Sequence, residues 1–552
     1  MKRAGWYPAA RQLQRWARVA ADPTFRHRHR AQRDEYETFA HDYGAMLSER
    51  FSSEHNNATV LLVGGGFPAG AKFECGLIKA LQAAGATPVV LTTNDPWVVK
   101  YYHLAGVRQM LFWEDVAEPL RLREAKRIVD AMTSTDALLA YERERVRVGR
   151  FAASSVLRRF RLGSIDFDQP ELRQQVTYFL AVAMSAAVSA TAILRTCQPS
   201  LALFMDRGYT PQGELFDACL ARQIPAVTWN SSHKSNALML KRYTRANRDD
   251  HHSSLSDQTW RRITAMRWTP AHRQRLREEL LSNYVSGDWY SEVGTQFRTK
   301  LLEAPRVRER LGLDPHKKTA VIFSHIFWDA TFFWGTDLFQ SYEAWFVETV
   351  RAACANDRLN WMIKVHPGNI VKNARDGIRS EPSELAALQR QVGPLPSHVT
   401  LIPADSDLST FSLFSVMDYC LTVRGTIGIE AASFGIPVLT AGTGRYDRQG
   451  FTIDSVSREE YLQRLAQLHE GAPLSAQQRE LAERFAYGIF LLRPLPFTSL
   501  TFGYQRDAVA TPTTRICVPT PEHWRSAPDL RMFTDWILGS RQEDFLLPEI
   551  RG

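Results

Sequence analysis

The hydrophobic and polar positions of the chain fall into short apolar runs separated by glycine-bearing turns and amphipathic stretches. The first clear run, ATVLLVGGG from Ala58, is rich in β-branched residues, and the amphipathic FECGLIKALQAAG and the apolar TPVVLTT follow it. A strand, helix and strand in this order form two parallel strands with a crossover helix. The pattern therefore predicts an α/β fold with a doubly wound parallel sheet.

Strand-like runs continue to about Asn230 and start again near Lys317. The residues between them are charged and rich in Trp and Arg without a strand pattern, which indicates a helical connector. Two α/β units joined in this way can face each other across a ligand-binding crevice. We expect five parts: an N-terminal helical extension at 1–57, a Rossmann-like domain with a helical insertion at 58–240, the connector at 241–300, a second Rossmann-like domain at 301–500, and a tail at 501–552 whose helix can cross back to the first domain.

The strongest local signal is the segment Thr422–Asp454, TVRGTIGIEAASFGIPVLTAGTGRYDRQGFTID. It predicts a buried strand, a turn and the start of a helix. Backbone N–H groups and the positive end of the helix dipole meet at such a turn, which suits a phosphate. Arg424 can add a two-pronged charged contact and Thr426 a hydroxyl. The turn residues are Arg424, Gly425, Thr426 and Gly428.

Glu430 lies four residues after Thr426, on the same face of the predicted helix. A carboxylate there can accept hydrogen bonds from a ribose diol. A second interpretation of the segment is an ordinary strand, loop and helix of an α/β core, in which Glu430 caps the helix or is solvated.

The segment WMIKVHPGN places Lys364 and His366 where a buried strand runs out into a loop. Pro367 disfavours helical geometry at His366 and keeps the imidazole at the end of the strand. A histidine there can donate to a phosphate oxygen or protonate a leaving group. A lone histidine is often structural, but this one is expected beside Arg424 and Thr426 at the same edge of the sheet.

Two carboxylates of the first half, Asp206 and Glu74, are expected at the sheet edge where open α/β folds bind ligands. Each can also be a cap or a loop carboxylate. GGGFPAGAK lacks the G-x-G-x-x-G register and the lysine of a phosphate loop, so we expect a cleft-lining loop and no dinucleotide cofactor. Asp405–Asp407 has the letters of a donor-metal motif but precedes a helix, which favours capping, so no metal site is predicted.

The composition is that of a folded soluble enzyme of two or three domains, with 552 residues of which 44% are hydrophobic. The longest apolar stretch, Tyr178–Leu194, contains serines and a threonine that favour a buried helix over a membrane span. The first residues lack the apolar block of a secretory signal, so we expect a cytoplasmic protein. The six cysteines have neither metal nor disulfide spacing and are expected to be buried thiols.

A formal net charge of +9 indicates an anionic partner: nucleic acid, an anionic sugar polymer, a nucleotide or a membrane surface. No recognisable nucleic-acid reader module is present, so we do not expect nucleic acid. The aromatic and arginine residues interleaved in Trp6–Arg18 can form a helix that rests on anionic lipid, which would make the protein peripheral at the inner face of the membrane. A solvated or domain-packing helix is an equal alternative.

Three motifs follow one another in the second half: His366–Pro367, then GTIGIEAASFGIPVLTAG, then GRYDRQGFTID. This series resembles the C-terminal nucleotide-sugar domain of bacterial capsule polysaccharide synthesis proteins, which include Kdo transferases and, more distantly, polysialyltransferases and teichoic acid glycerophosphate polymerases. The resemblance covers Ala320–Asp454. It implies a GT-B fold, in which two Rossmann-like domains face a cleft, the second holding the donor nucleotide and the first the acceptor.

The resemblance also implies roles for individual residues. His366 would meet the donor phosphate, Thr426 and its turn would hold the phosphates, and Glu430 would meet the ribose. The glycine- and tyrosine-containing loop would put Arg445 and Tyr446 near the cleft. Many relatives have a Ser-Ser or Ser-Thr pair in the turn where this chain has none, which leaves open whether the donor carries one phosphate or two.

The expected function is a glycosyltransferase that moves a sugar from a nucleotide-sugar donor to a surface polysaccharide or lipid-linked glycan, without a cofactor or donor metal. His366 would assist the departing phosphate, and Asp206 or Glu74 would activate the acceptor hydroxyl. A nucleotide-sugar epimerase or a CDP-glycerol-type glycerophosphotransferase on the same fold is an alternative. Another is a non-catalytic glycan-assembly protein that binds through its basic N-terminal helix.

Overall fold

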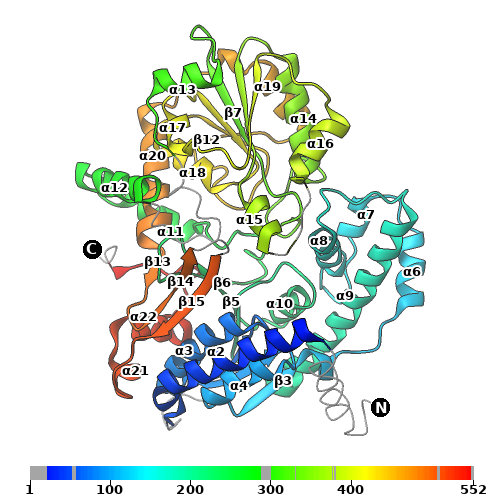
Figure 1. Ribbon diagram of the computed structural model, residues 1–552, viewed down its shortest axis with the longest axis vertical. Coiled ribbons are helices and arrows are strands. Elements are labelled where there is room, and N and C mark those ends of the chain that lie inside the picture. The colour runs from blue at the N-terminus through cyan, green and yellow to red at the C-terminus, as the bar shows by residue number, and fades with distance from the viewer. Residues whose placement is uncertain are drawn as a thin grey trace.

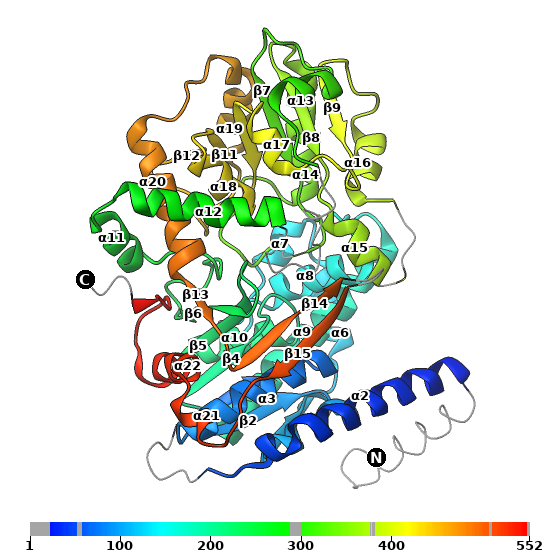
Figure 2. The same ribbon diagram turned by 60° about the vertical axis from the view of Figure 1, so that its left-hand side comes forward.

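A computed structural model of the chain describes residues 22–51, 58–286, 300–329, 331–375, 377, 381–506 and 510–548. The segment Trp6–Arg18, expected to form a lipid-binding helix, lies outside these ranges. The described chain contains two large sheets, each covered by helices on both faces and placed one above the other in Figure 1 and Figure 2. This architecture confirms the predicted α/β fold with two Rossmann-like, GT-B-like domains facing each other.

The first domain is built on a seven-stranded sheet in the order β13-β6-β5-β4-β1-β2-β3. Strands β1 to β5 are parallel, whereas β6 runs antiparallel to β5, and β13 runs antiparallel to β6. The bounds are β1 Thr59–Val63, β2 Thr87–Thr92, β3 Gln109–Phe112, β4 Leu201–Phe204, β5 Ala226–Ser231, β6 Ala237–Tyr243 and β13 Pro494–Pro496.

Alternate residues of β1 face opposite layers of helices. Leu61 and Val63 belong to the core formed with α8, α9 and α10, whereas Val60 and Leu62 belong to the core formed with α3, α4 and α22. A strand that is apolar at successive positions needs cover on both faces, because its side chains point alternately to the two sides. The helices, with the N-terminal α2, are α2 Pro23–Ser48, α3 Pro68–Ala83, α4 Pro96–Leu104, α8 Val148–Phe160, α9 Pro170–Cys197, α10 Gln212–Ala221 and α22 Pro528–Gly539.

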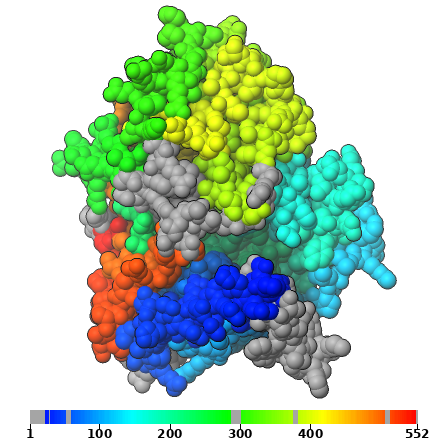
Figure 3. All heavy atoms as spheres, viewed as in Figure 1, coloured from blue at the N-terminus to red at the C-terminus, as the bar shows by residue number. Residues whose placement is uncertain are grey.

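The helical insertion after β3 forms a lobe at one side of the first domain, coloured cyan in Figure 3. Its longest helix, α9, is long and apolar enough to cross a membrane by length and composition, but 61% of its most apolar window is buried inside the protein. Ser185 Oγ donates to the Glu118 carbonyl at 2.5 Å, so a polar side chain of this helix has an internal partner. The burial matches the core helix predicted for Tyr178–Leu194. The insertion also contains α8 and three shorter helices, α5 Trp113–Val116, α6 Leu122–Asp130 and α7 Thr135–Leu139.

The second domain is built on a six-stranded sheet in the order β12-β11-β10-β7-β8-β9, and all neighbouring pairs are parallel. Ala320 and Ile322 of β7 pack towards α14, α16 and α19, whereas Val321 and Phe323 pack towards α18 and α20. The strands are β7 Thr319–Phe323, β8 Asn360–Lys364, β9 Val399–Ile402, β10 Tyr419–Thr422, β11 Val438–Thr440 and β12 Thr452–Asp454. The helices are α13 Ala304–Leu311, α14 Tyr342–Ala355, α15 Gly368–Arg375, α16 Ser383–Gln391, α17 Thr410–Phe414, α18 Thr426–Ser433, α19 Arg458–Ala466, the 3-10 turn η2 Leu468–Glu470 and α20 Ala476–Tyr487.

Two stretches of chain join the domains. The connector carries α11, Asp257–Ala265, and α12, Pro270–Ser286. After α20, the π-helical turn η3, Gly488–Leu492, leads back to the first domain, where β13 pairs with β6. A hairpin of β14, Leu500–Arg506, and β15, Ala510–Ile516, then packs on α3, and the short α21, His523–Ser526, precedes α22. The end of the chain therefore completes the core of the first domain.

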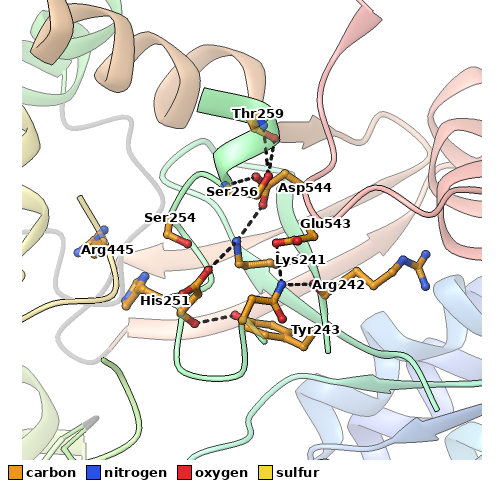
Figure 4. A network of polar contacts seen from close by, with 12 residues as sticks. Lys241, Arg242, Tyr243, His251, Ser254, Ser256, Thr259, Arg445, Glu543 and Asp544 are labelled. Carbon is orange, nitrogen blue, oxygen red and sulfur yellow. Dashed lines mark hydrogen bonds and ion pairs between the residues drawn. The ribbon is translucent and has the colours of Figure 1, made fainter. Parts of the chain in front are cut away.

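A buried polar network fastens this returning segment (Figure 4). Asp544 accepts from Lys241 Nζ at 3.1 Å and from the Ser256 amide at 2.7 Å, and Arg493 Nη1 lies 3.3 Å from it. Burial alone would raise the pKa of Asp544, but Arg493 and Lys241 outweigh it and hold that pKa well below the usual range. Since all three charged side chains are 0% exposed, the carboxylate neutralises cations that have no access to water.

We expect Asp544→Ala to lower the free energy of unfolding by about 3–5 kcal/mol, because it leaves two buried cations without their anion. In the unmodified protein this stabilisation should be present above about pH 4, the ordinary aspartate range, and be lost as the pH falls, since the folded-state pKa is depressed. Urea denaturation followed by tryptophan fluorescence measures both effects. Asp535→Ala, which removes an exposed carboxylate of α22, is the matched control, and an equal loss in both variants would contradict the account.

Candidate functional site

A cavity of about 580 Å³ lies between the two domains. Residues at or just after the carboxyl ends of β5, β7, β8 and β10 line it, together with the last turn of α12 and the first turn of α18. Open parallel sheets bind their ligands at this edge. The crevice expected between the two domains is therefore present, with walls from both.

The turn after β10 forms one wall of the cavity. Gly425 precedes α18 in an extended conformation, with φ −62° and ψ 150°, and its N–H donates to Thr422 Oγ1 at 3.1 Å. Among the described residues, no side chain caps α18. The N–H groups of its first turn, at Thr426 and Ile427, are therefore available to a ligand, together with the positive end of the helix dipole.

Tyr446 braces this turn from behind. Its hydroxyl donates to the Gly425 carbonyl at 2.8 Å, and its side chain is only 1% exposed. Gly428 makes the contact possible, because a Cβ there would lie 2.2 Å from the Tyr446 hydroxyl. Tyr446, expected near the cleft, thus supports the turn without lining the cavity.

The two arginines of the segment have different places. Arg424 is 4% exposed and does not line the cavity, because its guanidinium is held by Asp337, by the Tyr342 hydroxyl at 3.0 Å and by the Thr443 carbonyl at 3.1 Å. A direct contact between Arg424 and a phosphate does not fit this geometry, which corrects that expectation.

Arg445 lines the cavity in its place. Its guanidinium donates to Thr426 Oγ1 at 2.8 Å and to the Arg424 carbonyl at 2.9 Å, which fixes a cation beside the start of α18. Burial is the main cause that lowers the pKa of Arg445, to about 10, so the side chain stays charged at neutral pH.

Lys364 and His366, at the carboxyl end of β8, also line the cavity. Lys364 Nζ donates to the Pro403 carbonyl at 3.3 Å, and burial lowers its pKa to about 8. His366 Nδ1 accepts the Gly368 amide hydrogen at 2.9 Å, so the neutral ring carries its proton on Nε2. Burial, then Lys372, lowers the pKa of His366 to about 4, so it is neutral at pH 7 and can act as a hydrogen-bond donor.

A second histidine of the same wall, His325, was missed by the sequence reasoning. It follows β7, stacks on Tyr342 with ring centroids 4.6 Å apart, and its Nε2 accepts the Val423 amide hydrogen at 3.2 Å. Burial holds its pKa well below the usual range, so it too is neutral. The signal was available in KKTAVIFSH, where a histidine follows a buried strand as His366 does.

Glu430 lies on α18 one turn beyond Thr426 and lines the cavity. One of its carboxylate oxygens accepts a hydrogen bond from Tyr284 of α12. Burial raises the pKa of Glu430 to about 7, although the bond from Tyr284 opposes the shift. The carboxyl group is therefore close to half ionised at neutral pH.

The two carboxylates expected on the acceptor side do not line the cavity. Glu74 is fully buried under the glycine loop. Its carboxylate accepts hydrogen bonds from the Tyr102 hydroxyl and from the Gly65 amide at 3.1 Å, so it is not accessible to an acceptor substrate. Asp206 is 39% exposed after β4 and lies 3.6 Å from Arg158. Of the two, only Asp206 is exposed to solvent.

The first domain and the connector contribute other residues to the cavity that the sequence patterns do not reveal. His233 and His252 line it from the turn after β5 and from the connector. Burial lowers both pKa values, so these rings are neutral as well. Their sequence contexts, SSHKS and DDHHSS, carry no periodic signal, which is why they could not be found.

No group of three or more metal-type side chains occurs in the described ranges of the chain. In the Asp405–Asp407 motif, Asp407 pairs with Arg310 and Lys300, and Ser409 caps α17. The capping role expected for the motif thus belongs to a neighbouring serine.

The chain matches no protein-family model, and no curated protein matches it significantly. Among solved structures, it is similar to KpsC of Thermosulfurimonas dismutans, a beta Kdo 2,4 transferase, with 16% identity over 54% of this chain and 81% of that chain and a TM-score of 0.34. A UDP-GlcNAc 2-epimerase from Neisseria meningitidis bound to UDP-GlcNAc has 14% identity over 78% of this chain and 96% of that chain, with a TM-score of 0.27.

The spinosyn rhamnosyltransferase SpnG complexed with thymidine diphosphate is a third similar structure, with 12% identity over 78% of this chain and 96% of that chain and a TM-score of 0.27. The similar structures thus include glycosyltransferases and a nucleotide-sugar epimerase.

We expect Gly428→Ala to lower the free energy of unfolding by about 1–3 kcal/mol, since its Cβ would collide with the Tyr446 hydroxyl. Removing that hydroxyl in the double variant with Tyr446→Phe should recover part of the loss. Denaturant titrations of the single and double variants measure this coupling. Simple addition of the two losses would contradict a close approach of Gly428 and Tyr446.

Proposed function

We propose that this protein is a nucleotide-sugar-dependent glycosyltransferase whose donor lies in the interdomain cavity. The observation that carries the proposal is the uncapped start of α18 beside a fixed guanidinium, Arg445, within a cavity lined by both domains. Oriented N–H groups and a cation in one place suit the phosphate of a nucleotide.

In this proposal, catalysis rests on stabilising the departing nucleotide phosphate. Arg445, Lys364 and the first turn of α18 supply positive potential, and His366 donates from Nε2. These groups are already in place around the cavity, so their orientation costs little when charge develops on the phosphate. The bond from the anomeric carbon to the phosphate oxygen breaks, and the acceptor hydroxyl forms the new bond and releases its proton.

The acceptor in this proposal enters from the side of the first domain. Asp206, on the loop after β4, is the accessible carboxylate of the pair and is the proposed general base. A glycan or lipid-linked glycan is the proposed acceptor class, and the reaction would take place in the cytoplasm, where nucleotide sugars are found.

A thermal-shift screen against CMP, CDP, UDP, GDP, TDP and their sugars tests donor binding. At least one nucleotide should raise the melting temperature, by the equivalent of about 2.7 kcal/mol at one hundred times its dissociation constant. Arg445→Met should abolish this shift, whereas Arg448→Met, an exposed arginine of the same loop, should keep it. No shift from any nucleotide at millimolar concentration would contradict the proposal.

We expect His366→Ala to slow cleavage of the sugar–phosphate bond in the tightest-binding donor by about 10²–10⁴-fold, measured as the rate at which free nucleotide is produced. Donor binding should weaken much less, since the hydrogen bond from His366 matters most when charge develops on the phosphate. His316→Ala, which removes an exposed histidine of the same domain, is the control. Release of free, altered sugar without transfer would instead favour an epimerase. An equal loss of binding and rate would contradict the role given to His366.

Donor affinity should follow a bell-shaped pH profile. Below about pH 7, Glu430 gains a proton and loses its ability to accept from both ribose hydroxyls, and above about pH 8, Lys364 loses its charge. His366 is neutral across this range, because its pKa lies at about 4. Calorimetry with the intact sugar nucleotide measures the profile.

Matched variants identify the groups that titrate in this profile. Glu430→Gln should flatten its acidic arm, and Lys364→Met should flatten its basic arm. An unchanged acidic arm in Glu430→Gln would contradict a contact between Glu430 and the donor.

A further inference from the structure

The C-terminal half of the connector helix α12 is fixed to both domains at the wall of the cavity. Glu279 lies 3.0 Å from His233 Nε2 and 2.8 Å from Lys234 Nζ, both in the turn between β5 and β6. Five residues on, Tyr284 donates to Glu430 of the second domain. Side chains between these two anchors are therefore held at defined positions.

Asn283 lies between the anchors, lines the cavity and is only 4% exposed. Across the part of the chain that the structure describes, its carboxamide has no hydrogen-bond partner. Its polar atoms are open to the cavity although the side chain as a whole is nearly buried. The carboxamide can therefore hydrogen-bond a ligand that enters the cavity.

The place of Asn283 follows from the order of residues along the cavity. Thr426 stands at the start of α18, Glu430 lies one turn beyond it, and Tyr284 holds Glu430 from α12. Asn283 is the sequence neighbour of Tyr284. With a phosphate at Thr426 and a ribose at Glu430, the next part of a nucleotide in this direction is its base.

The hydrogen-bonding groups of Asn283 suit the edge of a heteroaromatic ring. Its sequence neighbour Tyr284 also lines the cavity and is held in place by Phe411 and Phe414, whose ring centroids lie 5.3 Å and 5.9 Å away. A carboxamide presents a donor and an acceptor side by side, whereas the cations of the cavity, Lys364 and Arg445, can only donate. Nucleobases carry neighbouring donors and acceptors on their hydrogen-bonding edges.

We propose that Asn283 is a nucleobase-recognition residue, which binds the hydrogen-bonding edge of the donor's base with its carboxamide. This assignment rests on the proposed nucleotide-sugar function. In this assignment, the part of the site that selects the nucleotide lies on the connector helix α12 and not on either of the two Rossmann-like domains.

The test compares a nucleotide with the same ligand lacking a base. Calorimetry measures the binding of two ligands to the full-length protein: the nucleoside 5′-monophosphate that carries the base of the most stabilising nucleotide in the thermal-shift panel, and ribose 5-phosphate. Asn283→Ala should weaken the nucleotide about 10-fold or more and leave ribose 5-phosphate unchanged. Asn283→Asp, which keeps the shape and removes the donor, should have the same direction of effect and guards against a folding defect in the alanine variant.

Gln274→Ala is the matched control, because it removes an exposed carboxamide from the same helix. It should leave both affinities unchanged. Equal weakening of nucleotide and ribose 5-phosphate by both Asn283 variants, or no weakening of either, would overturn the role of Asn283 while nucleotide binding itself stands. Failure of the wild-type protein to bind any nucleotide would overturn this role and the proposed function together.

Discussion

The carboxyl ends of the parallel strands in two separate sheets meet at one cavity, and the proposed chemistry depends on this constraint. A single sheet could bring together His366 and Thr426, which follow β8 and β10. Only a second sheet in the opposite position can add His233 and close the space from the other side. The returning chain end, with Asp544 buried among cations, completes the core of the domain that carries this opposing wall.

Burial decides which charged groups of the cavity are available to a ligand. The charge of Arg424 is neutralised by Asp337 inside the second domain, whereas Arg445 keeps its charge beside the first turn of α18. Histidines on both sides are neutral, because burial lowers their pKa values. The site therefore has positive potential localised at the start of α18 and neutral hydrogen-bond donors around it. This arrangement favours a small anion such as a phosphate over an extended anionic surface.

The sequence allowed much of the fold and part of the site to be predicted. Buried runs followed by glycine turns marked the strands, and residues directly after such runs, such as His366 and Thr426, line the cavity. Local pattern could not separate Arg424 from Arg445, because the difference is made by Asp337, which lies in another loop. Likewise, Glu74 follows a strand as expected, but the packing of Tyr102 decides that it points into the core.

The connector was the least predictable part. Its sequence has no strand pattern, so Asn283 and His252 gave no sign that they line the cavity, and their positions depend on anchors in two domains. This region would give the proposed site its selectivity, whereas the strand ends would give it phosphate binding. The positions of the connector residues depend on tertiary contacts, whereas the residues at the strand ends are marked by the local sequence.

The most direct test of the account is a crystal structure of the protein with the nucleotide that stabilises it most. The account predicts a phosphate within hydrogen-bond distance of the Thr426 and Ile427 amides and of Arg445, with the ribose at Glu430. A nucleotide bound outside the interdomain cavity, or one that places its base at the start of α18 and its phosphate elsewhere, would contradict it.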